Sequence, residues 1–241
     1  MYRYLFFALL LILIVVSAIQ FTLPSRESTF QDFNNPNYVE FESGIRRLRD
    51  GTVEVASLVN MPGVTSDMFR RWFSDYLQTT EQYKMWHPKD HVWMDWEHKT
   101  PGEITGSHHL VHEYIGGEMK KLRIQFTWPQ EILGYDPSNE NTVALCARVG
   151  ELESSMNIAE MCHVARDMPW GAEIRSRFWL GVVSDREAGY LKNFLLSLIA
   201  NNPISRHLVV SEAEALALHK HCIEEMSYLA DILPAIKQGT N

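Results

Sequence analysis

The sequence predicts an α+β domain in which an antiparallel sheet is folded around one long C-terminal helix. Segments with strand-like alternation follow one another from Thr52 to Val183, with turns between them. The pair Gly116-Gly117 separates two of these segments and is a strong hairpin signal, which makes the flanking strands antiparallel. The capping box Ser211-Glu212-Ala213-Glu214 opens a final helix that extends from about Glu212 to Ile232. Strands grouped before a terminal helix are typical of the α+β class.

Turn residues bound each of the predicted elements. Thr52–Leu58 alternates apolar and polar side chains and ends shortly before the turn Met61-Pro62-Gly63. Thr65-Ser66-Asp67 then caps a helix whose apolar stripe starts at Met68. A helical pattern returns from Glu187 and ends near Asn201-Asn202-Pro203. The remaining predicted strands are Ile104–Ile115, Met119–Trp128, Thr142–Val149, Ile158–Ala165 and Ile174–Val183.

The first 42 residues are predicted to lie outside the folded domain. Leu5–Ile19 is almost unbroken apolar sequence preceded by Arg3, which is typical of a signal peptide or an uncleaved anchor. Because the hydrophobicity continues beyond an acceptable cleavage site at Ala18, the pattern favours an anchor. We therefore expect residues 1–23 to hold the protein at a membrane, or to direct its secretion if they are cleaved. Residues 24–42 are polar and turn-rich and predict a linker, which leaves residues 43–241 as a single domain.

The bulk composition excludes two classes of protein. The formal net charge of −8 gives no electrostatic attraction to a polyanion, so nucleic acid is not an expected partner. Cys146, Cys162 and Cys222 are odd in number and lack CxxC spacing, which argues against a disulfide scaffold and a cysteine zinc ribbon. We expect three small buried hydrophobic side chains, with one disulfide pair left open as the alternative.

The stretch Tyr83–His91 concentrates groups that suit a functional site. It holds a phenol, two imidazoles, a carboxylate, an indole and a proline. Pro88 pushes His87 out of helical geometry, so the stretch is predicted to be a rigid connector that presents side chains. Such a set suits a metal site or acid–base chemistry. The alternative is a loop whose aromatic side chains fill the core.

The final helix carries a second candidate pair. His221 and Glu225 are four residues apart and share a mostly apolar, inward-facing stripe. A buried carboxylate beside a buried imidazole is costly unless the two groups bind a cation or each other. A metal site and a structural hydrogen bond both remain open from this pair alone.

Two predicted strands add further candidates. In Ile104–Ile115, His109 and Glu113 share one face of the strand, and the sequence leaves open whether that face is the interior one. His163 is the one ionisable side chain on its face of Ile158–Ala165. It is either a buried core histidine or an acid–base group.

Five segments in order resemble a known family: Tyr83–His91, His112–Gly117, Cys162–Asp167, Glu173–Gly181 and His221–Glu225. Together they are similar to the 2,4-diacetylphloroglucinol hydrolase and phloretin hydrolase family, over roughly Asp50 to the end of the long helix. The resemblance implies a helix-grip fold like that of the Bet v 1 and START proteins, in which a curved sheet wraps a C-terminal helix.

The resemblance also implies a zinc-dependent hydrolase that cleaves the carbon–carbon bond between an acyl group and a phenolic ring. The implied zinc ligands are His91, Glu113, His221 and Glu225, with Glu118 as the alternative to Glu113. His163 is implied as the acid–base histidine, and Tyr83 and Asp95 as substrate contacts, with Met94 as the alternative match to Asp95.

The residue types fit that chemistry, because two imidazoles and two carboxylates balance the charge of Zn²⁺ without thiolates. We therefore predict a metal-dependent hydrolase of a small aromatic ketone. The alternative, from a different class, is a non-catalytic binder of hydrophobic ligands on the same helix-grip fold. A homo-oligomer is compatible with both functions.

Overall fold

Eight antiparallel strands form a single curved sheet in a computed structural model that describes residues 23–238. The strand order across the sheet is β1-β2-β8-β7-β6-β5-β4-β3. The strands are β1 (Gly44–Arg47), β2 (Val53–Pro62), β3 (His91–Glu97), β4 (His108–Ile115), β5 (Glu118–Thr127), β6 (Thr142–Glu151), β7 (Met156–Met168) and β8 (Gly171–Asp185).

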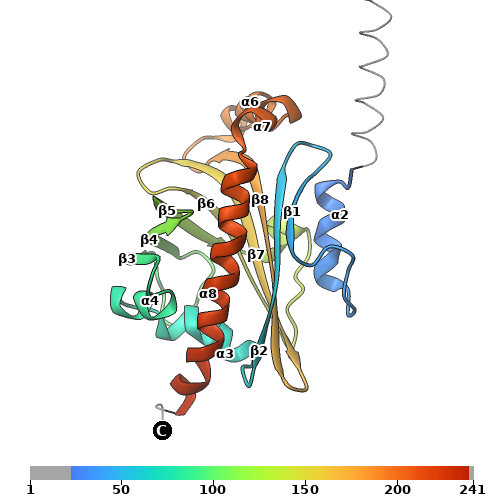
Figure 1. The fold of residues 1–241 in the computed structure, drawn as a ribbon. Coiled ribbons are helices and arrows are strands. Elements are labelled where there is room, and N and C mark those ends of the chain that lie inside the picture. Colours follow the sequence, from blue (N-terminus) through green and yellow to red (C-terminus); the bar gives the residue numbers. More distant parts are fainter. Residues whose placement is uncertain (1–22, 239–241) are drawn as a thin grey trace, which may run out of the picture.

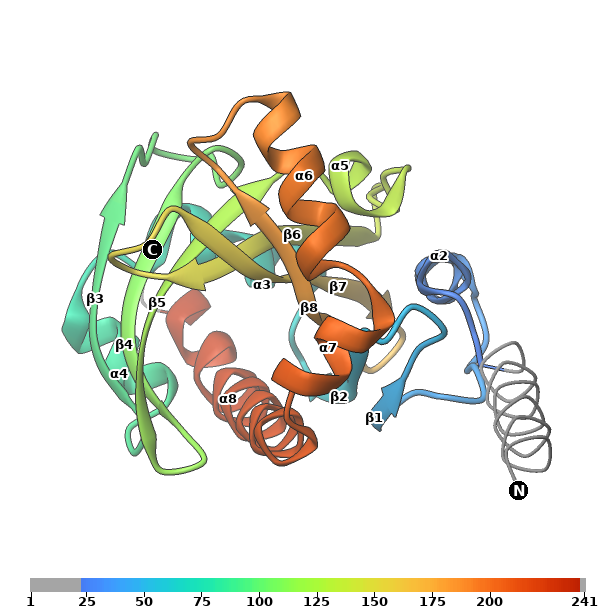
Figure 2. The same cartoon turned by 90° about the horizontal axis from the view of Figure 1, so that it is seen from above.

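One long helix, α8 (Glu212–Gln238), lies in the hollow of this sheet (Figures 1 and 2). The sheet curves around α8, so the predicted α+β helix-grip architecture is confirmed. The shorter helical elements are α2 (Arg26–Phe30), η1 (Gln31–Asn34), α3 (Ser66–Arg71), η2 (Trp72–Tyr76), α4 (Thr80–Trp86), α5 (Pro129–Leu133), α6 (Tyr190–Ala200) and α7 (Pro203–Val209).

The main core fills the space between α8 and the concave face of the sheet. On α8 the buried apolar residues recur every three to seven positions, at Ala215, Cys222, Met226, Leu229 and Leu233. This spacing gives the helix one apolar face. Opposite it, alternate residues of the strands point inward, such as Met161 and Ala165 of β7.

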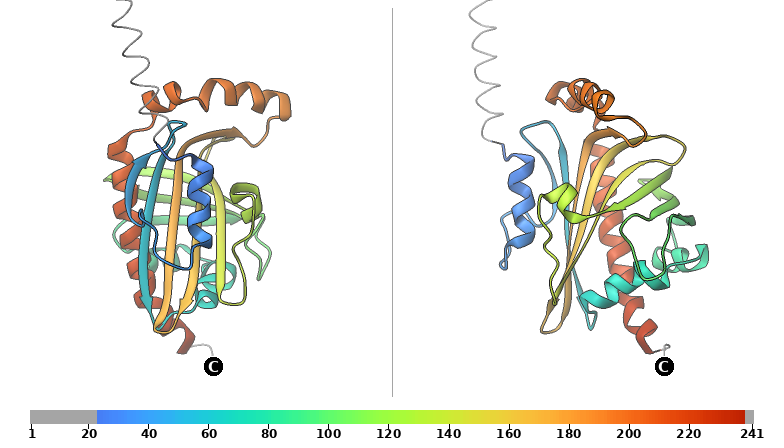
Figure 3. Two further views of the ribbon diagram at one scale, coloured as in Figure 1. Left: turned by 90° about the vertical axis from the view of Figure 1, so that its right-hand side faces the viewer. Right: turned by 180° about the vertical axis from the view of Figure 1, so that it is seen from behind.

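The segment 24–42 is not a linker, and that prediction is wrong. It folds as α2 and η1 against the face of the sheet opposite α8 (Figure 3). Phe30 and Phe33 are buried against the indole of Trp179, the nearer ring at 5.0 Å between centroids. Arg175 reaches out from β8 to donate hydrogen bonds to the backbone carbonyls of Asn35 and of two neighbouring residues. The Glu42 carboxylate, 2.8 Å from the Arg175 guanidinium, adds an ion pair to these contacts.

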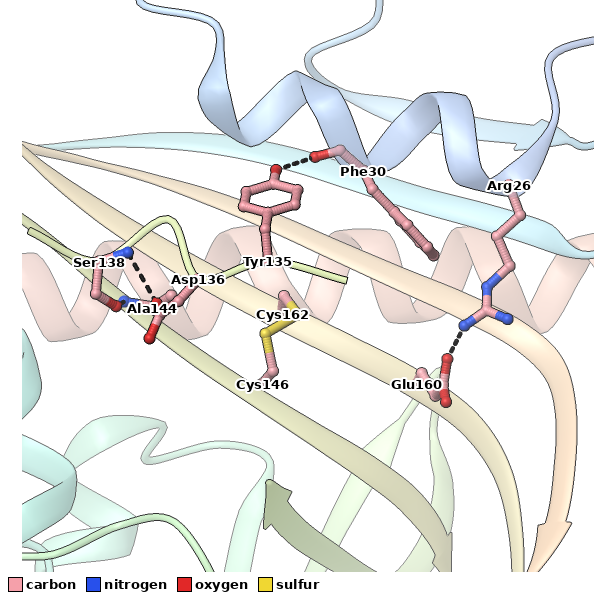
Figure 4. The surroundings of a disulfide bond; sticks show 9 residues. All are labelled: Arg26, Phe30, Tyr135, Asp136, Ser138, Ala144, Cys146, Glu160 and Cys162. Atoms are coloured by element: carbon pink, nitrogen blue, oxygen red, sulfur yellow. Dashed lines mark hydrogen bonds and ion pairs between the residues drawn. A yellow bond between two sulfur atoms is a disulfide. The ribbon is translucent and has the colours of Figure 1, made fainter. Parts of the chain in front are cut away.

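Under α2 the outer core contains a disulfide between Cys146 and Cys162, so the expectation of three free cysteines is wrong (Figure 4). The register of β6 and β7 pairs these two residues directly across the strands. A cross-link that closes a loop of 16 residues contributes about 3 kcal/mol by restricting the unfolded chain. Figure 4 also shows Arg26 of α2 paired with Glu160, which ties the helix to β7.

The predicted elements differ from the observed ones in several places. The helices α4 and α5 were not predicted, and α4 includes the first four residues of the stretch Tyr83–His91, which was predicted to be a connector. Neither β1 nor β3 was predicted, and β4 begins at His108 rather than at Ile104. The helical pattern expected to end near Pro203 continues as the separate helix α7. All of the other predicted strands occur, most of them longer than expected.

The predicted anchor or signal segment lies outside the described residues, except for Leu23. Within residues 23–238, no helix combines the length and the apolar character that crossing a membrane requires.

Candidate metal centre and cavity

His91 and Glu113 are brought together by the pairing of β3 with β4. A capping box at Thr79 starts α4, and the helix ends at His87, just before Pro88. His91 is therefore the first residue of β3, where it pairs directly with Glu113 of β4. The His91 Nε2 and Glu113 Oε2 atoms are 3.7 Å apart, and both side chains are buried.

The other two candidate ligands come from α8. His221 Nε2 lies 3.9 Å from Glu113 Oε2, and Glu225 Oε2 lies 3.8 Å from His91 Nε2. His221 and Glu225 are one helical turn apart, with Nε2 and Oε2 separated by 4.0 Å. Ligand atoms of His91, Glu113 and His221 thus all lie within 4.8 Å of one another, and Glu225 Oε2 lies within 4.0 Å of both imidazole nitrogens.

Two buried nitrogens at this centre lack a partner. His91 Nε2 and His221 Nε2 have no hydrogen bond to any described residue, although both are shielded from solvent. The Nδ1 of His91 lies 2.9 Å from the backbone oxygen of Tyr83 and donates to it, which leaves the lone pair on Nε2. An inward-facing nitrogen lone pair fixed by an outer hydrogen bond is typical of a histidine that binds a metal.

The protonation equilibria fit a cation at the same place. Burial raises the pKa of Glu225 well above its usual value, and the neighbouring Glu113 carboxylate raises it further. Burial also lowers the pKa of His91, so its imidazole is neutral, the form that binds metals. Two buried carboxylates close to each other are unfavourable without a positive charge among them. The donor set therefore fits a divalent cation.

Tyr83 supports Glu113 rather than standing apart from it. Its hydroxyl donates to Glu113 Oε2, and its ring stacks on His91 at 3.7 Å between centroids. Burial raises the pKa of Tyr83 well above its usual value, so the phenol keeps its proton. The hydroxyl oxygen still has acceptor capacity toward a ligand in the cavity.

Asp90 and His87 lie behind His221, on the side away from the centre. Asp90 Oδ2 is 3.5 Å from His221 Nδ1, and the ring of His87 stacks on that of His221 at 5.0 Å. The backbone N–H of Asp90 donates to His87 Nδ1, so the neutral His87 ring carries its proton on Nε2. His87, Asp90 and His221 form a second group of close potential ligand atoms, which shares His221 with the first group.

His163 occupies a separate wall of the site. It lies on the inward face of β7, and its Nδ1 is 2.7 Å from the hydroxyl oxygen of Ser176 on β8. The rings of Phe69 and Phe178 are nearly perpendicular to the imidazole, with centroids 6.4 and 5.5 Å from its centroid. Burial lowers the pKa of His163 to about 4, so the side chain is neutral at physiological pH.

This depressed pKa predicts a loss of stability in acid. Between about pH 6.5 and pH 4 the unfolded chain binds a proton at His163 that the folded protein does not, so stability falls as the pH falls. Replacement His163→Gln should remove about 2 kcal/mol of the acid sensitivity between roughly pH 7 and pH 4.5. Denaturant unfolding of both proteins at each pH, with a chelator present throughout, measures it. If both proteins lose the same amount of stability over this pH range, the lowered pKa assigned to His163 is contradicted.

A cavity of about 780 Å³ connects the centre with His163. Glu113, His221 and Glu225 line one part of it, and His163 lines another. Aromatic and aliphatic side chains form most of the remaining wall, including Phe73, Trp86, Phe126, Met161 and Phe178. Its size suits a small aromatic ligand.

His109 is a cavity residue that was left undecided by the sequence. It is fully buried, stacks on Trp96 at 4.5 Å, and meets Tyr83 edge to face. Burial lowers the pKa of His109 to about 3. The sequence did show that His109 and Glu113 lie on the same face of the strand. Because Glu113 points inward in the structure, that face is the inward one.

Asp95 does not reach the cavity, and its predicted substrate contact is wrong. Its side chain is exposed and accepts a hydrogen bond from the N–H of Trp96, while Met94 is buried. The cause is an irregularity between His91 and Trp93 that shifts the register and reverses the alternation.

The alternative ligand Glu118 also lies away from the centre. It is exposed at the start of β5, and its carboxylate pairs with Lys120 at 2.9 Å. Glu113 is therefore the glutamate that this strand pair offers to the centre.

Comparison with known families shows which family the chain belongs to. The model of the DAPG hydrolase PhiG domain matches residues 25–237. The chain belongs to this family. The match confirms the predicted family and includes the segment that packs on the outer face of the sheet.

Two curated relatives of this DAPG hydrolase family member cover most of the chain. A 2,4-diacetylphloroglucinol hydrolase of Pseudomonas sp is 26% identical over 227 residues, which is 86% of this chain and 75% of the relative. The phloretin hydrolase of Eubacterium ramulus is 28% identical over 200 residues, which is 78% of this chain and 68% of the relative. Among solved structures, ginseng major latex-like protein 151 from Panax ginseng is similar with 11% identity and a TM-score of 0.38, over 70% of this chain and 97% of that one.

Proposed function

We propose that this protein is a zinc-dependent hydrolase that cleaves the carbon–carbon bond between an acyl group and a phenolic ring. The observation that carries the proposal is the convergence of two unpartnered imidazole nitrogens and two buried carboxylates at the wall of an apolar cavity. The names of the two hydrolase relatives support the substrate class.

His91, Glu113, His221 and Glu225 would hold the metal. Two neutral imidazoles and two carboxylates leave a Zn²⁺ site without net charge, which suits an interior position. When bound, zinc supplies Lewis acidity, either to polarise the acyl carbonyl or to activate water. Tyr83 fixes both sides of the site, because its hydroxyl orients Glu113 and its backbone oxygen orients His91. Asp90 Oδ2 lies 3.5 Å from His221 Nδ1, on the other side of that imidazole.

The proposed reaction adds water across the bond that joins the acyl carbon to the ring. The hydroxyl of water ends on the acyl carbon, and a proton ends on the ring carbon, giving a carboxylic acid and the deacylated phenol. Protonation of the ring carbon first gives the keto tautomer, which makes the ring a tolerable leaving group.

His163 is the group suited to move this proton. Its Nδ1 is engaged with Ser176, which leaves Nε2 for the cavity. The neutral imidazole can take a proton from a phenolic hydroxyl of the substrate. Because burial disfavours the imidazolium, the proton is readily passed on to the ring carbon. Tyr83 also lines the cavity, where its hydroxyl oxygen can accept a hydrogen bond from a second phenolic hydroxyl.

Turnover of acylated phenols tests this function. Purified full-length protein loaded with zinc should release the carboxylic acid and the deacylated ring in equal amounts. Chelation should abolish the release, and added zinc should restore it. Tight binding of the ketone without any release would instead support the alternative, a binder of hydrophobic ligands.

We also infer that the domain lies in an oxidising compartment. The Cys146–Cys162 disulfide supports this location, because such bonds are rare in the reducing cytosol. The apolar sequence at residues 5–19 supports the same location, because a cleaved signal, or an anchor that keeps Arg3 on the cytoplasmic side, delivers the following domain across a membrane. A homo-oligomer stays a prediction.

A further inference from the structure

The helices α6 and α7 carry an unusual density of exposed apolar side chains. No residue of α6 is buried. Tyr190 of α6 is 88% exposed, and on α7 Ile204 and Leu208 are 74% and 81% exposed. Scattered exposed hydrophobic residues are ordinary, but a gathered set marks an interaction surface. We define the α6–α7 apolar face by six residues: Tyr190, Leu191, Leu198, Ile199, Ile204 and Leu208.

This face has almost no charge of its own. The sequence from Tyr190 to Val210 contains no aspartate or glutamate. Its lysine, Lys192, is paired with Asp185 at 2.8 Å. Its arginine, Arg206, is buried and paired with Asp50 at 2.5 Å. The exposed surface therefore offers a partner apolar contact rather than salt bridges.

The α6–α7 apolar face lies where the described chain begins. Figure 1 shows α6 and α7 at the same end of the molecule as the start of α2, with the C-terminal end of α8 at the other. The backbone oxygen of Leu23 accepts a hydrogen bond from Arg49 at 3.2 Å. The next residue, Asp50, holds Arg206 of α7. Arg49 and Asp50 are adjacent in the connection between β1 and β2. Together they link Leu23, where the described chain begins, to Arg206 of α7.

The sequence before Leu23 indicates what kind of partner the α6–α7 apolar face contacts. Leu5–Ile19 is apolar enough to reside in a bilayer, and it leads directly to the position that is tied to α7. An anchor entering the domain there holds the α6–α7 apolar face close to the membrane surface. With 11 residues, α6 is about 16 Å long, too short to span a bilayer but suited to lie in its interface.

We propose that the α6–α7 apolar face docks on a lipid bilayer, at the boundary between the headgroups and the acyl chains. The docking is independent of the catalytic chemistry, because no proposed ligand and no acid–base residue lies on these two helices. It goes beyond the predicted anchor, because it fixes the orientation of the domain on the membrane.

Environment-sensitive fluorophores on single introduced cysteines test the docking. Leu198→Cys places a dye on the α6–α7 apolar face, and Ile204→Cys provides a second position on α7. Asp231→Cys is the matched control, because it is also exposed but lies about five turns further along α8. The native thiols do not compete, since Cys222 is buried and the other two are joined. Each full-length protein is reconstituted into phosphatidylcholine vesicles with ordinary or brominated acyl chains.

Docking predicts a blue-shifted emission from the dyes at positions 198 and 204, and a loss of that emission with brominated lipid. The dye at position 231 should show neither change. If the first two dyes behave like the control, the proposal is overturned. It is also overturned if their emission shifts with protein concentration in the absence of vesicles and ignores brominated lipid, which would indicate contact with a second copy.

Discussion

Replacement His221→Ala is expected to reduce zinc affinity by more than the roughly 100-fold that loss of an outer partner costs. His221 Nε2 lies within 4.0 Å of both candidate carboxylates, so its removal deletes one of two neutral nitrogen ligands. The two buried carboxylates would then face each other with less compensation, and at neutral pH one of them should take up a proton. Zinc titration against a chelating indicator measures the affinity.

His219→Ala is the matched control for this change. It removes an imidazole from the same helix two residues earlier, where Nε2 contacts the Ser43 hydroxyl at 2.9 Å and no candidate ligand. The control should bind zinc as the unchanged protein does. Equal zinc affinity in both variants would show that α8 does not supply the nitrogen ligand.

Replacement His163→Gln is expected to lower kcat by about 10²–10⁴-fold, the range usual for loss of a general acid–base group. Zinc content should be unchanged, because His163 comes from β7 and contacts Ser176 of β8, whereas the candidate ligands come from β3, β4 and α8. Glutamine keeps a polar group near Ser176 but cannot carry the proton at neutral pH. Steady-state turnover of an acylated phenol, with metal content measured on the same samples, separates the two effects.

His112→Gln serves as the control for His163, because it changes a strand histidine on the outer face of β4. It should leave kcat close to that of the unchanged protein. The acid–base assignment fails if His163→Gln turns over substrate normally, or if it loses activity only in proportion to lost zinc.

The sequence predicted the architecture because hydrophobic periodicity and turn signals act locally. The helical spacing of His221 and Glu225 placed both on the inward face of α8, as observed. The alternation of β4 grouped His109 with Glu113 but could not say which face was interior. That depends on packing against α8, which is a property of the whole fold.

Other features required long-range information. The resemblance implied Asp95 as a substrate contact, but an irregularity in the register of β3 after His91 turns Met94 inward and Asp95 outward. The polar segment 24–42 resembles a linker until the buried guanidinium of Arg175 is known to need its carbonyl groups. The pairing of Cys146 with Cys162 follows from the β6–β7 register, which no cysteine spacing reveals.

For the proposed membrane contact, too, one part could be predicted from the sequence and another part required the fold. The apolar stretch 5–19 is visible in the sequence, and so is the helical pattern after Glu187. Their proximity depends on contacts between Leu23, Arg49 and α7, which only the folded structure reveals.

The most direct test of the central claim is elemental analysis of the purified full-length protein after loading with zinc and removal of excess metal. The account predicts one tightly bound zinc ion per chain, because His91, Glu113, His221 and Glu225 converge on one position. A protein that folds normally and retains no zinc or other divalent metal would contradict it.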